Sequence, residues 1–115
     1  MIGIYMIYNA GLRKVYIGQS EDIERRIEQH FKSLQKNKHS NKMMQEDYNG
    51  MSHAFQIIIL KECYPSQLNY YEKEFIKYYH SDDPRYGYNL TKGGAKRKRL
   101  NKKGRYSDLL DELTG

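Results

Sequence analysis

Residues 3–18 read GIYMIYNAGLRKVYIG and carry the strongest structural signal in the sequence. Ile, Tyr and Val dominate the two halves of this stretch, so residues 2–8 and 14–18 predict two β-strands. The residues between them include Asn and Gly, which favour turns, and the whole stretch therefore predicts a tight β-hairpin. Tyr5 and Tyr16 then lie on neighbouring strands and place two phenol groups on one rigid platform.

Further helices, one strand and a short extended piece are predicted beyond the hairpin. They are a helix at 22–37, a second helix at 41–48, a strand at 54–61, a helix from Pro65 to about Tyr79, and an extended piece at 88–90. The strand carries a continuous apolar run, which predicts burial on both of its faces. This order of elements predicts an α+β fold in which helices flank a three-stranded sheet.

Charge divides the 115 residues, which carry a net +6, into two unequal parts. Residues 1–94 contain 13 Lys and Arg against 11 Asp and Glu, whereas residues 95–115 contain 7 against 3. We expect one folded domain in residues 1–94 and a basic C-terminal tail in residues 95–115. The tail sequence at 107–113 is compatible with one short helix. A basic tail on a nearly neutral domain indicates a polyanionic partner, most often nucleic acid; the alternative is a solvated end that aids solubility.

Cysteine usage and hydropathy narrow the class of protein. Cys63 is the only cysteine, which excludes a disulfide framework within the chain and a cysteine-rich metal ribbon. No apolar run approaches the roughly 18 residues of a membrane span, and no signal-peptide pattern opens the sequence. We therefore expect a soluble, cytoplasmic protein without a membrane partner.

The predicted helix at 22–37 carries two polar residues at the edge of its apolar stripe. With about 100° of turn per residue, the stripe consists of Ile23, Ile27, Phe31 and Leu34. Arg26 and His30 fall on one edge of this stripe, one turn apart, whereas Arg25 points to solvent. A guanidinium beside a core stripe indicates either a function or an arginine that reaches from the core edge to water.

The last predicted helix places a carboxylate inside its apolar stripe, which consists of Leu68, Phe75, Ile76 and Tyr79. Glu72 falls among these side chains, whereas Glu74 faces water. A buried carboxylate is expected to be neutralised, paired or bound to metal, and a structural ion pair with Arg26 is the alternative to a functional role. The convergence of two tyrosines, an arginine, a histidine and a glutamate is more typical of a functional site than of packing.

Together these residues resemble the GIY-YIG nuclease family. The ordered matches are Gly3-Ile4-Tyr5, Tyr16-Ile17-Gly18, Arg26, His30, Glu72 with Phe75-Ile76, and Gly87-Tyr88-Asn89. His39-Ser40 and the run from Tyr88 to Gly94 look most like the catalytic domain of phage-type homing endonucleases. The resemblance covers residues 1–94 and implies a small three-stranded antiparallel sheet flanked by helices. It also implies that a phage could encode the protein.

The same resemblance implies metal-dependent hydrolysis of DNA phosphodiester bonds that leaves 5′-phosphate and 3′-hydroxyl ends. The implied catalytic residues are Tyr5, Tyr16, Arg26, His30, Glu72 and Asn89. In the family the glutamate, here Glu72, holds one Mg²⁺ or Mn²⁺ ion, a tyrosine activates water and the arginine stabilises the attacked phosphate. The expected substrate-binding residues are Gly18, His39, Lys92, Lys96, Arg97, Lys98 and Arg99.

Three alternatives stay open. Tyr5 is favoured as the general base with Tyr16 as its orienting partner, and the reverse assignment is the alternative. The first functional hypothesis is a DNA endonuclease that acts as a monomer or as a transient dimer on DNA. The second is a nuclease-like module that binds nucleic acid without cutting it, and the third is a small ribosome-associated protein. Because the sequence is short for a homing endonuclease, we expect either the catalytic part of a longer protein or a small free-standing nuclease.

Overall fold

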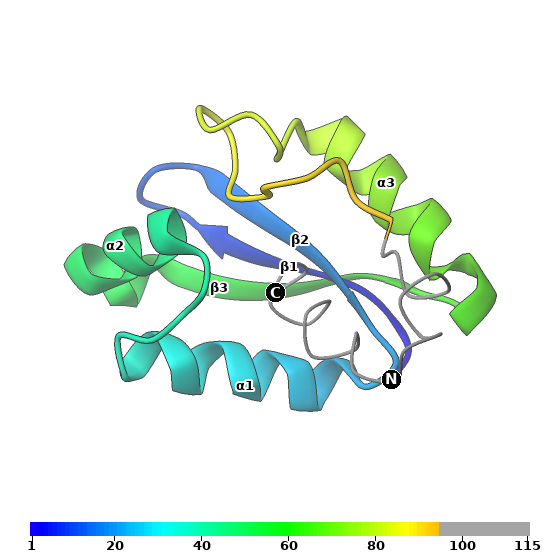
Figure 1. Ribbon diagram of the computed structural model, residues 1–115, viewed down its shortest axis with the longest axis horizontal. Coiled ribbons are helices and arrows are strands. Elements are labelled where there is room, and N and C mark those ends of the chain that lie inside the picture. The colour runs from blue at the N-terminus through cyan, green and yellow to red at the C-terminus, as the bar shows by residue number, and fades with distance from the viewer. Residues whose placement is uncertain (95–115) are drawn as a thin grey trace, which may run out of the picture.

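The computed structural model describes residues 1–94; residues 95–115, which hold the predicted basic tail and its helix at 107–113, lie outside the described part. The helices and strands run in the order β1 Gly3–Asn9, β2 Lys14–Ser20, α1 Ile23–Gln35, α2 Lys42–Met51, β3 Phe55–Glu62 and α3 Leu68–Tyr79 (Figure 1). Short 3₁₀ helices at Ser52–Ala54 and Pro65–Gln67 lead into β3 and α3. The predicted α+β class is confirmed.

The three strands form one antiparallel sheet in the order β2-β1-β3, so the first strand of the hairpin takes the centre. The hairpin register places Tyr5 opposite Gly18 and Ile7 opposite Tyr16. Because side chains alternate along a strand and opposed residues share a face, both tyrosines lie on one face of the sheet. β2 continues two residues beyond the predicted end at 18, to Ser20.

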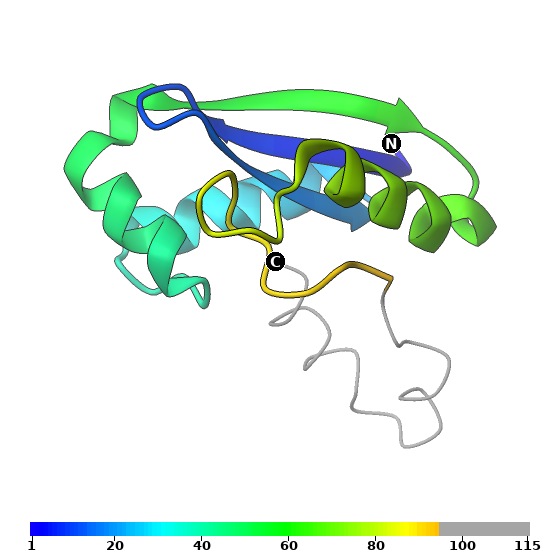
Figure 2. The same cartoon turned by 90° about the horizontal axis from the view of Figure 1, so that it is seen from above.

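Helices cover both faces of this sheet, with α1 and α2 on one side and α3 on the other (Figures 1 and 2). The core under α1 and α2 consists of Tyr5, Ile7, Tyr16, Ile23, Leu34, Met44 and Tyr88. The core under α3 consists of Ile4, Met6, Val15, Ile17, Leu68 and Ile76. Both α1 and α3 contact β2, which is an edge strand, from opposite faces of the sheet.

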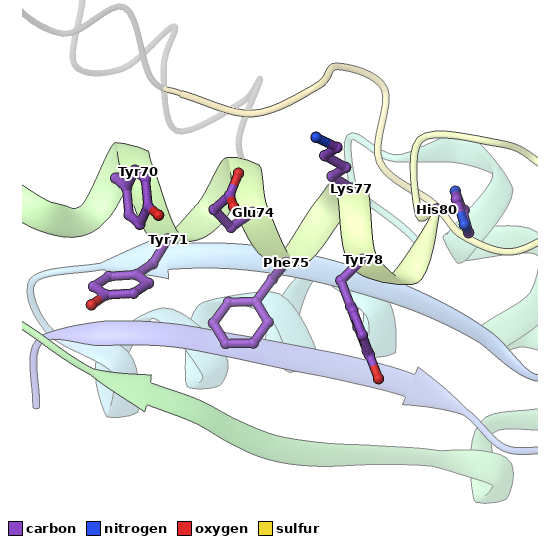
Figure 3. Close-up of a pocket in the computed structure, with 7 residues that line it drawn as sticks. All are labelled: Tyr70, Tyr71, Glu74, Phe75, Lys77, Tyr78 and His80. Atoms are coloured by element: carbon purple, nitrogen blue, oxygen red, sulfur yellow. The ribbon is translucent and has the colours of Figure 1, made fainter.

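α3 presents its apolar stripe to the sheet and carries a carboxylate within it. Leu68, Glu72 and Ile76 are buried, as predicted. Phe75 is only partly buried, because an open groove of about 710 Å³ runs along this helix. Figure 3 draws the side chains that line the groove: Tyr70, Tyr71, Glu74, Phe75, Lys77, Tyr78 and His80. The groove therefore involves none of the predicted site residues.

β3 is less buried than its apolar sequence predicts. It is an outer strand beside β1, and its Ile58 and Ile59 are 39% and 43% exposed. The prediction that residues 54–61 are buried on both faces is therefore wrong. An apolar run does not distinguish a central strand from an edge strand, and here α3 packs chiefly on β2 and β1.

Two helix boundaries differ from the prediction for local reasons. α2 follows the N-cap residue Asn41, whose side chain accepts a hydrogen bond from the Met44 N–H (3.0 Å), and it continues past 48 to Met51. Pro65 opens a 3₁₀ turn, so the regular α3 helix begins only at Leu68.

Within residues 1–94, no helix combines the length and the apolar character that a membrane crossing requires.

The segment that follows α3 returns along the outer edge of β2. The Tyr88 N–H donates to the Val15 carbonyl (2.9 Å), and Gly87 forms a single parallel bridge with Val15. Gly87 also packs tightly against Ser81, where only glycine fits, because a β-carbon on Gly87 would lie 2.4 Å from the Ser81 Cα. The predicted extended piece thereby carries Asn89 to the edge of the sheet.

Candidate active site

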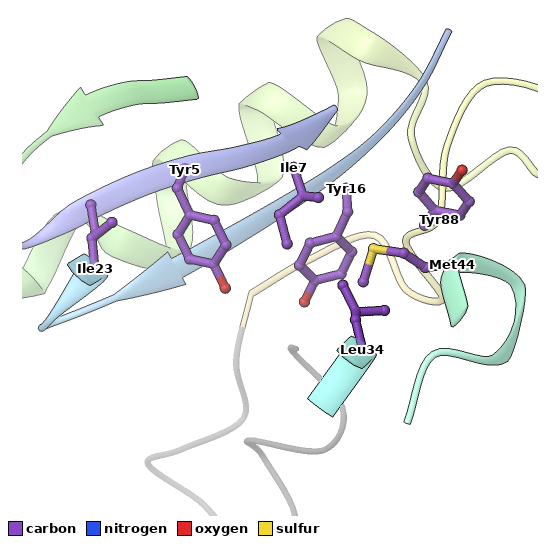
Figure 4. Close-up of a cluster of buried hydrophobic side chains, with 7 residues drawn as sticks. All are labelled: Tyr5, Ile7, Tyr16, Ile23, Leu34, Met44 and Tyr88. Carbon is purple, nitrogen blue, oxygen red and sulfur yellow. The ribbon is translucent and has the colours of Figure 1, made fainter. Parts of the chain in front are cut away.

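Tyr5, Tyr16 and His30 form a buried cluster of rings between the sheet and α1. The ring centroids lie 6.5 Å apart for the two tyrosines, 5.6 Å for Tyr5 and His30, and 5.5 Å for Tyr16 and His30. Figure 4 shows the hydroxyl groups of both tyrosines projecting from the same side of the hairpin. His30, which the helical spacing placed at the edge of the stripe, is almost fully buried because it packs against both phenol rings.

Gly18 makes room for the phenol of Tyr5. The two residues are opposed in the hairpin register, and a β-carbon on Gly18 would lie 2.4 Å from both Cζ and the hydroxyl oxygen of Tyr5. Gly18 was expected to contact substrate, but it is buried. The last residue of the second tripeptide therefore acts by leaving space in which the Tyr5 ring crosses to the partner strand.

A chain of hydrogen bonds runs inward from the Tyr5 hydroxyl. This hydroxyl lies 2.7 Å from Nε2 of His30, whose Nδ1 lies 2.8 Å from Nε2 of His39. The Asn41 N–H donates to Nδ1 of His39 (3.0 Å). His39 was expected to bind substrate; it is 4% exposed and lies behind His30, so its contacts described in residues 1–94 are with the protein interior.

The environment assigns different protonation behaviour to the rings of this cluster. Burial, the nearby Arg26 charge and His39 hold the pKa of His30 well below its usual range, so its imidazole is neutral at neutral pH. Burial, Tyr5 and Glu72 raise the pKa of the Tyr16 phenol well above its usual value, and Arg26 only partly opposes them. The Tyr16 phenol is therefore protonated at neutral pH.

The Tyr16 hydroxyl is buried and has no hydrogen-bond partner among residues 1–94. Buried hydroxyl groups in folded proteins are nearly always paired with protein or water. Its ring lies 6.5 Å from the ring of Tyr5, measured between centroids. The Tyr16 hydroxyl is therefore available to a water molecule or to an oxygen of a bound ligand.

Arg26 lies at the margin of this cluster, as its helical position predicts. It is partly buried on α1, and its Nη1 donates to Oε1 of Gln29 (3.0 Å). Its charge acts on the pKa of both Tyr16 and His30. Arg25, one residue earlier, is exposed, so the predicted distinction between the two arginines is confirmed.

Glu72 approaches the same strand edge from α3 and is 2% exposed. Its Oε1 accepts hydrogen bonds from Nε2 of Gln19 (3.0 Å) and from the Gly94 N–H (2.8 Å). Both donors are neutral amides, which orient the carboxylate without neutralising its charge. Gln19 is itself buried and also donates to Oδ1 of Asn69 (2.8 Å). Glu74 is exposed, as predicted.

The donor set around Glu72 fits one kind of metal binding and not another. Within residues 1–94, no three His, Cys, Asp or Glu side chains gather into a cluster that would enclose an ion. Mg²⁺ does not need such a cage, because it keeps several waters and takes oxygen ligands from one or two carboxylates and from substrate phosphates. A single buried, amide-oriented carboxylate therefore fits a hydrated divalent cation.

Asn89 holds the returning segment against β2. Its Oδ1 accepts from the Ile17 N–H (2.8 Å), and its Nδ2 donates to the Ile17 carbonyl (2.9 Å), so the side-chain amide imitates a neighbouring strand. This pairing accounts for its presence at the strand edge. Lys92 is exposed and pairs with Asp82 (3.2 Å), and the other four expected substrate-binding residues, at 96–99, lie outside the described part.

Two residues that the sequence reasoning missed complete the arrangement. Gln19 was left out because the second strand was predicted to end at 18; alternation from Ile17 would have placed Gln19 on the α3 face. Asn41 was not singled out as the residue that anchors His39. The sequence does contain a signal for Asn41, because an Asn directly before a helical segment is a strong N-cap residue. A capping residue is held in place together with the backbone next to it.

Comparisons with known proteins agree with this geometry. The family model of the GIY-YIG catalytic domain matches residues 1–89. "Intron-associated endonuclease 1" of Enterobacteria phage T4 is 40% identical over 74 residues, which make up 64% of this chain and 28% of the T4 protein. The chain thus spans a little over a quarter of that relative.

Two solved structures of the catalytic domain of the intron homing endonuclease I-TevI are also similar. Each superimposes with a TM-score of 0.72 at 33% sequence identity. The matches cover 81% and 79% of this chain, and 96% and 99% of the solved chains. The chain belongs to the GIY-YIG nuclease family, and residues 1–89 are its catalytic domain.

Proposed function

We propose that the chain is a metal-dependent DNA endonuclease that hydrolyses phosphodiester bonds to 5′-phosphate and 3′-hydroxyl ends. One observation carries the proposal: the Tyr16 phenol lies at once in the electrostatic field of Tyr5, Glu72 and Arg26. The charges of Glu72 on α3 and of Arg26 on α1 thus both act on the Tyr16 phenol of β2. The family membership and the endonuclease relatives support the same reaction class.

The positive charge of Arg26 suits phosphodiester hydrolysis. The bond to be cleaved is already anionic, and attack by water or hydroxide builds further negative charge on the phosphate. A cation held in a partly buried position stabilises that charge more than it stabilises the ground state. Arg26 meets this requirement, because it is partly buried and acts on the two rings of the site.

The two tyrosines take different roles. Tyr16, whose pKa is raised and whose hydroxyl has no partner within residues 1–94, donates a hydrogen bond and orients the attacking water or a phosphate oxygen. Tyr5 is the general base, because its oxygen is the one that pairs with His30. An unperturbed phenol has a pKa of about 10, so this role needs positive charge and hydrogen-bond donors close to the Tyr5 oxygen.

Glu72 would hold the divalent cation, Mg²⁺ or Mn²⁺, with Gln19 and the Gly94 N–H orienting its carboxylate. When bound, the ion supplies positive charge for the phosphate under attack. A single active site cuts one DNA strand in each encounter. Double-strand cleavage therefore needs a transient dimer on DNA or a second encounter.

The T4 relative is described as an intron-associated endonuclease, and this chain corresponds to 28% of it. We propose DNA as the substrate here too, with the basic residues at 96–99 adding contacts to its phosphates.

Nicking of supercoiled plasmid, with and without Mg²⁺, tests the proposal. We expect cleavage only with the metal, and we expect Glu72→Gln to abolish it while DNA binding persists. Glu74→Gln removes an equal charge from the exposed side of the same helix and should cut normally. Binding without metal-dependent cleavage would favour the non-cutting module, and substantial cleavage by Glu72→Gln would remove Glu72 from the reaction.

A further inference from the structure

We propose that His39 is a positioning residue: together with the Asn41 backbone N–H, it fixes the tautomer of His30 so that His30 Nε2–H donates to the Tyr5 oxygen. The inference rests on the proposed function for its catalytic meaning. The direction of the hydrogen bonds follows from the buried contacts themselves, and it begins at a group that is only able to donate.

The Asn41 N–H is that group, and it is firmly held. Asn41 is 5% exposed and caps α2, with Oδ1 accepting from the Met44 N–H (3.0 Å). Its Nδ2 donates to the Tyr88 carbonyl (2.6 Å). The backbone N–H points at Nδ1 of His39 (3.0 Å), and because an N–H donates only, this Nδ1 is the unprotonated, accepting nitrogen.

His39 then carries its proton on Nε2. A neutral imidazole has one donor and one acceptor nitrogen, so acceptance at Nδ1 assigns the hydrogen to the other nitrogen. That nitrogen lies 2.8 Å from Nδ1 of His30. The backbone of His39 is also held, because its N–H donates to Oε1 of the buried Gln45 (2.9 Å).

His30 receives this hydrogen bond at Nδ1 and therefore carries its own proton on Nε2, 2.7 Å from the Tyr5 hydroxyl oxygen. The reverse order, with the proton on Nδ1 of both rings, would set the Nδ1–H of His39 against the Asn41 N–H. Such opposed donors are unfavourable in a buried site, where water does not compensate them.

This polarity gives Tyr5 a specific property. Its oxygen accepts from His30, so its own hydrogen points away from the histidine. Loss of that hydrogen leaves a phenolate that already has a donor, which is the hydrogen-bond arrangement that favours the charged form. In the resting state His30 is thus a donor to Tyr5 and not the acceptor of its proton.

The tautomer of His30 is measurable in the wild-type protein without DNA. Long-range ¹H–¹⁵N correlation spectra of protein labelled at histidine distinguish the Nδ1–H and Nε2–H forms. We expect Nε2–H for both His30 and His39. Observation of the Nδ1–H form at His30 would overturn the proposal, whatever the protein does to DNA.

Two matched substitutions test the catalytic consequence. His39→Gln keeps an N–H donor near the position of Nε2, whereas His39→Glu presents only acceptor oxygens there when ionised. Both lose the acceptor for the Asn41 N–H, so both should unfold at a lower temperature than wild type. His39→Glu should be the less stable of the two, because it also buries a charge. We expect His39→Gln to retain the Nε2–H form of His30. Its kcat should therefore stay within about tenfold of wild type, well short of the loss of about 10²–10⁴-fold that removal of acid–base catalysis would cause.

His39→Glu should convert His30 to the Nδ1–H or doubly protonated form and lower kcat by about 10²–10⁴-fold, with KM unchanged. Gln35→Glu adds the same charge on the exposed end of α1 and should leave kcat unchanged. Equal kcat values for the two folded His39 variants would overturn the positioning role. A wild-type protein that fails to cut DNA would instead overturn the proposed function, since the tautomer is read without it.

Discussion

Gly18 and Tyr5 face each other across the hairpin, and the phenol of Tyr5 occupies the space that a side chain at residue 18 would fill. A β-carbon there would come within 2.4 Å of the ring. The two tripeptides of the motif are thus one steric unit, in which the glycine on β2 sets the position of the Tyr5 hydroxyl on β1.

Gly18→Ala should therefore displace the Tyr5 ring. We expect a loss of about 1–3 kcal/mol in the free energy of unfolding, as for other overpacked cores, together with a severe fall in nicking rate. Urea denaturation and plasmid nicking measure the two effects. Gly50→Ala is the matched control, because a β-carbon there meets no atom within 4 Å. A normal rate for Gly18→Ala would show that the Tyr5 position is not critical.

Phenylalanine substitutions separate the two tyrosines. Tyr5→Phe removes the partner of His30 and should lower the cleavage rate by about 10²–10⁴-fold. Tyr16→Phe removes a hydroxyl that has no partner among residues 1–94, so it should not lower thermal stability, although it should slow cleavage. Single-turnover rates and melting temperatures check both variants. A Tyr5→Phe protein that cuts as fast as wild type would transfer the role of base to Tyr16.

Arg26 and Arg25 differ in exposure although they are adjacent on α1. Arg26→Ala should lower kcat by about 10²–10³-fold, the scale of removing one group that stabilises transition-state charge. Arg25→Ala should change kcat little, because that side chain is exposed. Steady-state cleavage of a short duplex measures both. If Arg25→Ala proves the more damaging change, the guanidinium at the site has been assigned to the wrong residue.

His30 should make the protein sensitive to acid. Its unfolded pKa is about 6.5, and burial, Arg26 and His39 depress the pKa in the folded protein. As the pH falls below about 6.5, the unfolded chain binds a proton that the folded protein does not, and stability falls by up to about 1.4 kcal/mol per pH unit. Above that pH this contribution is fully present. The rings of Tyr5 and Tyr16 also pack against the His30 ring.

Urea denaturation at about pH 5 and about pH 7 measures this loss. His30→Gln should reduce the difference between the two values, whereas His53→Gln, at an exposed position, should preserve it. An unchanged pH dependence in His30→Gln would mean that another group is responsible for the acid sensitivity.

The basic tail should strengthen DNA binding without reading its sequence. Residues 96–115 contain 7 Lys and Arg against 3 Asp and Glu. Deleting them should weaken binding about equally on unrelated duplexes. It should also make affinity less dependent on salt, by about 0.9 in the logarithmic slope for each DNA phosphate that the tail neutralises. Fluorescence anisotropy over a range of salt concentrations checks this.

Catalysis at saturating DNA should survive the same deletion, because the site lies in residues 1–94. Steady-state cleavage by the truncated protein measures its kcat, and circular dichroism checks that it is folded. A folded but inactive truncation would place part of the tail in the site.

Local patterns in the sequence were sufficient for most of the fold. The hairpin at 3–18, the helices and the burial of Glu72 follow from alternation, turn residues and helical spacing, because each depends on neighbours within a few residues. The exposure of Arg25 and the partial burial of Arg26 follow in the same way. These short-range rules also place Tyr5 and Tyr16 on one face of one sheet.

Contacts between segments that are distant in the sequence could not be predicted from local patterns. The apolar run at 54–61 became an edge strand, because the sheet order depends on which strand the helices cover. The hydrogen bond between His39 and His30 and the pairing of Asn89 with Ile17 depend on the path of the chain through the fold, which no local pattern encodes. The direction of the hydrogen bond at the Tyr5 oxygen is also not readable from local sequence. It depends on the backbone N–H of Asn41, and the start of α2 fixes the position of that group.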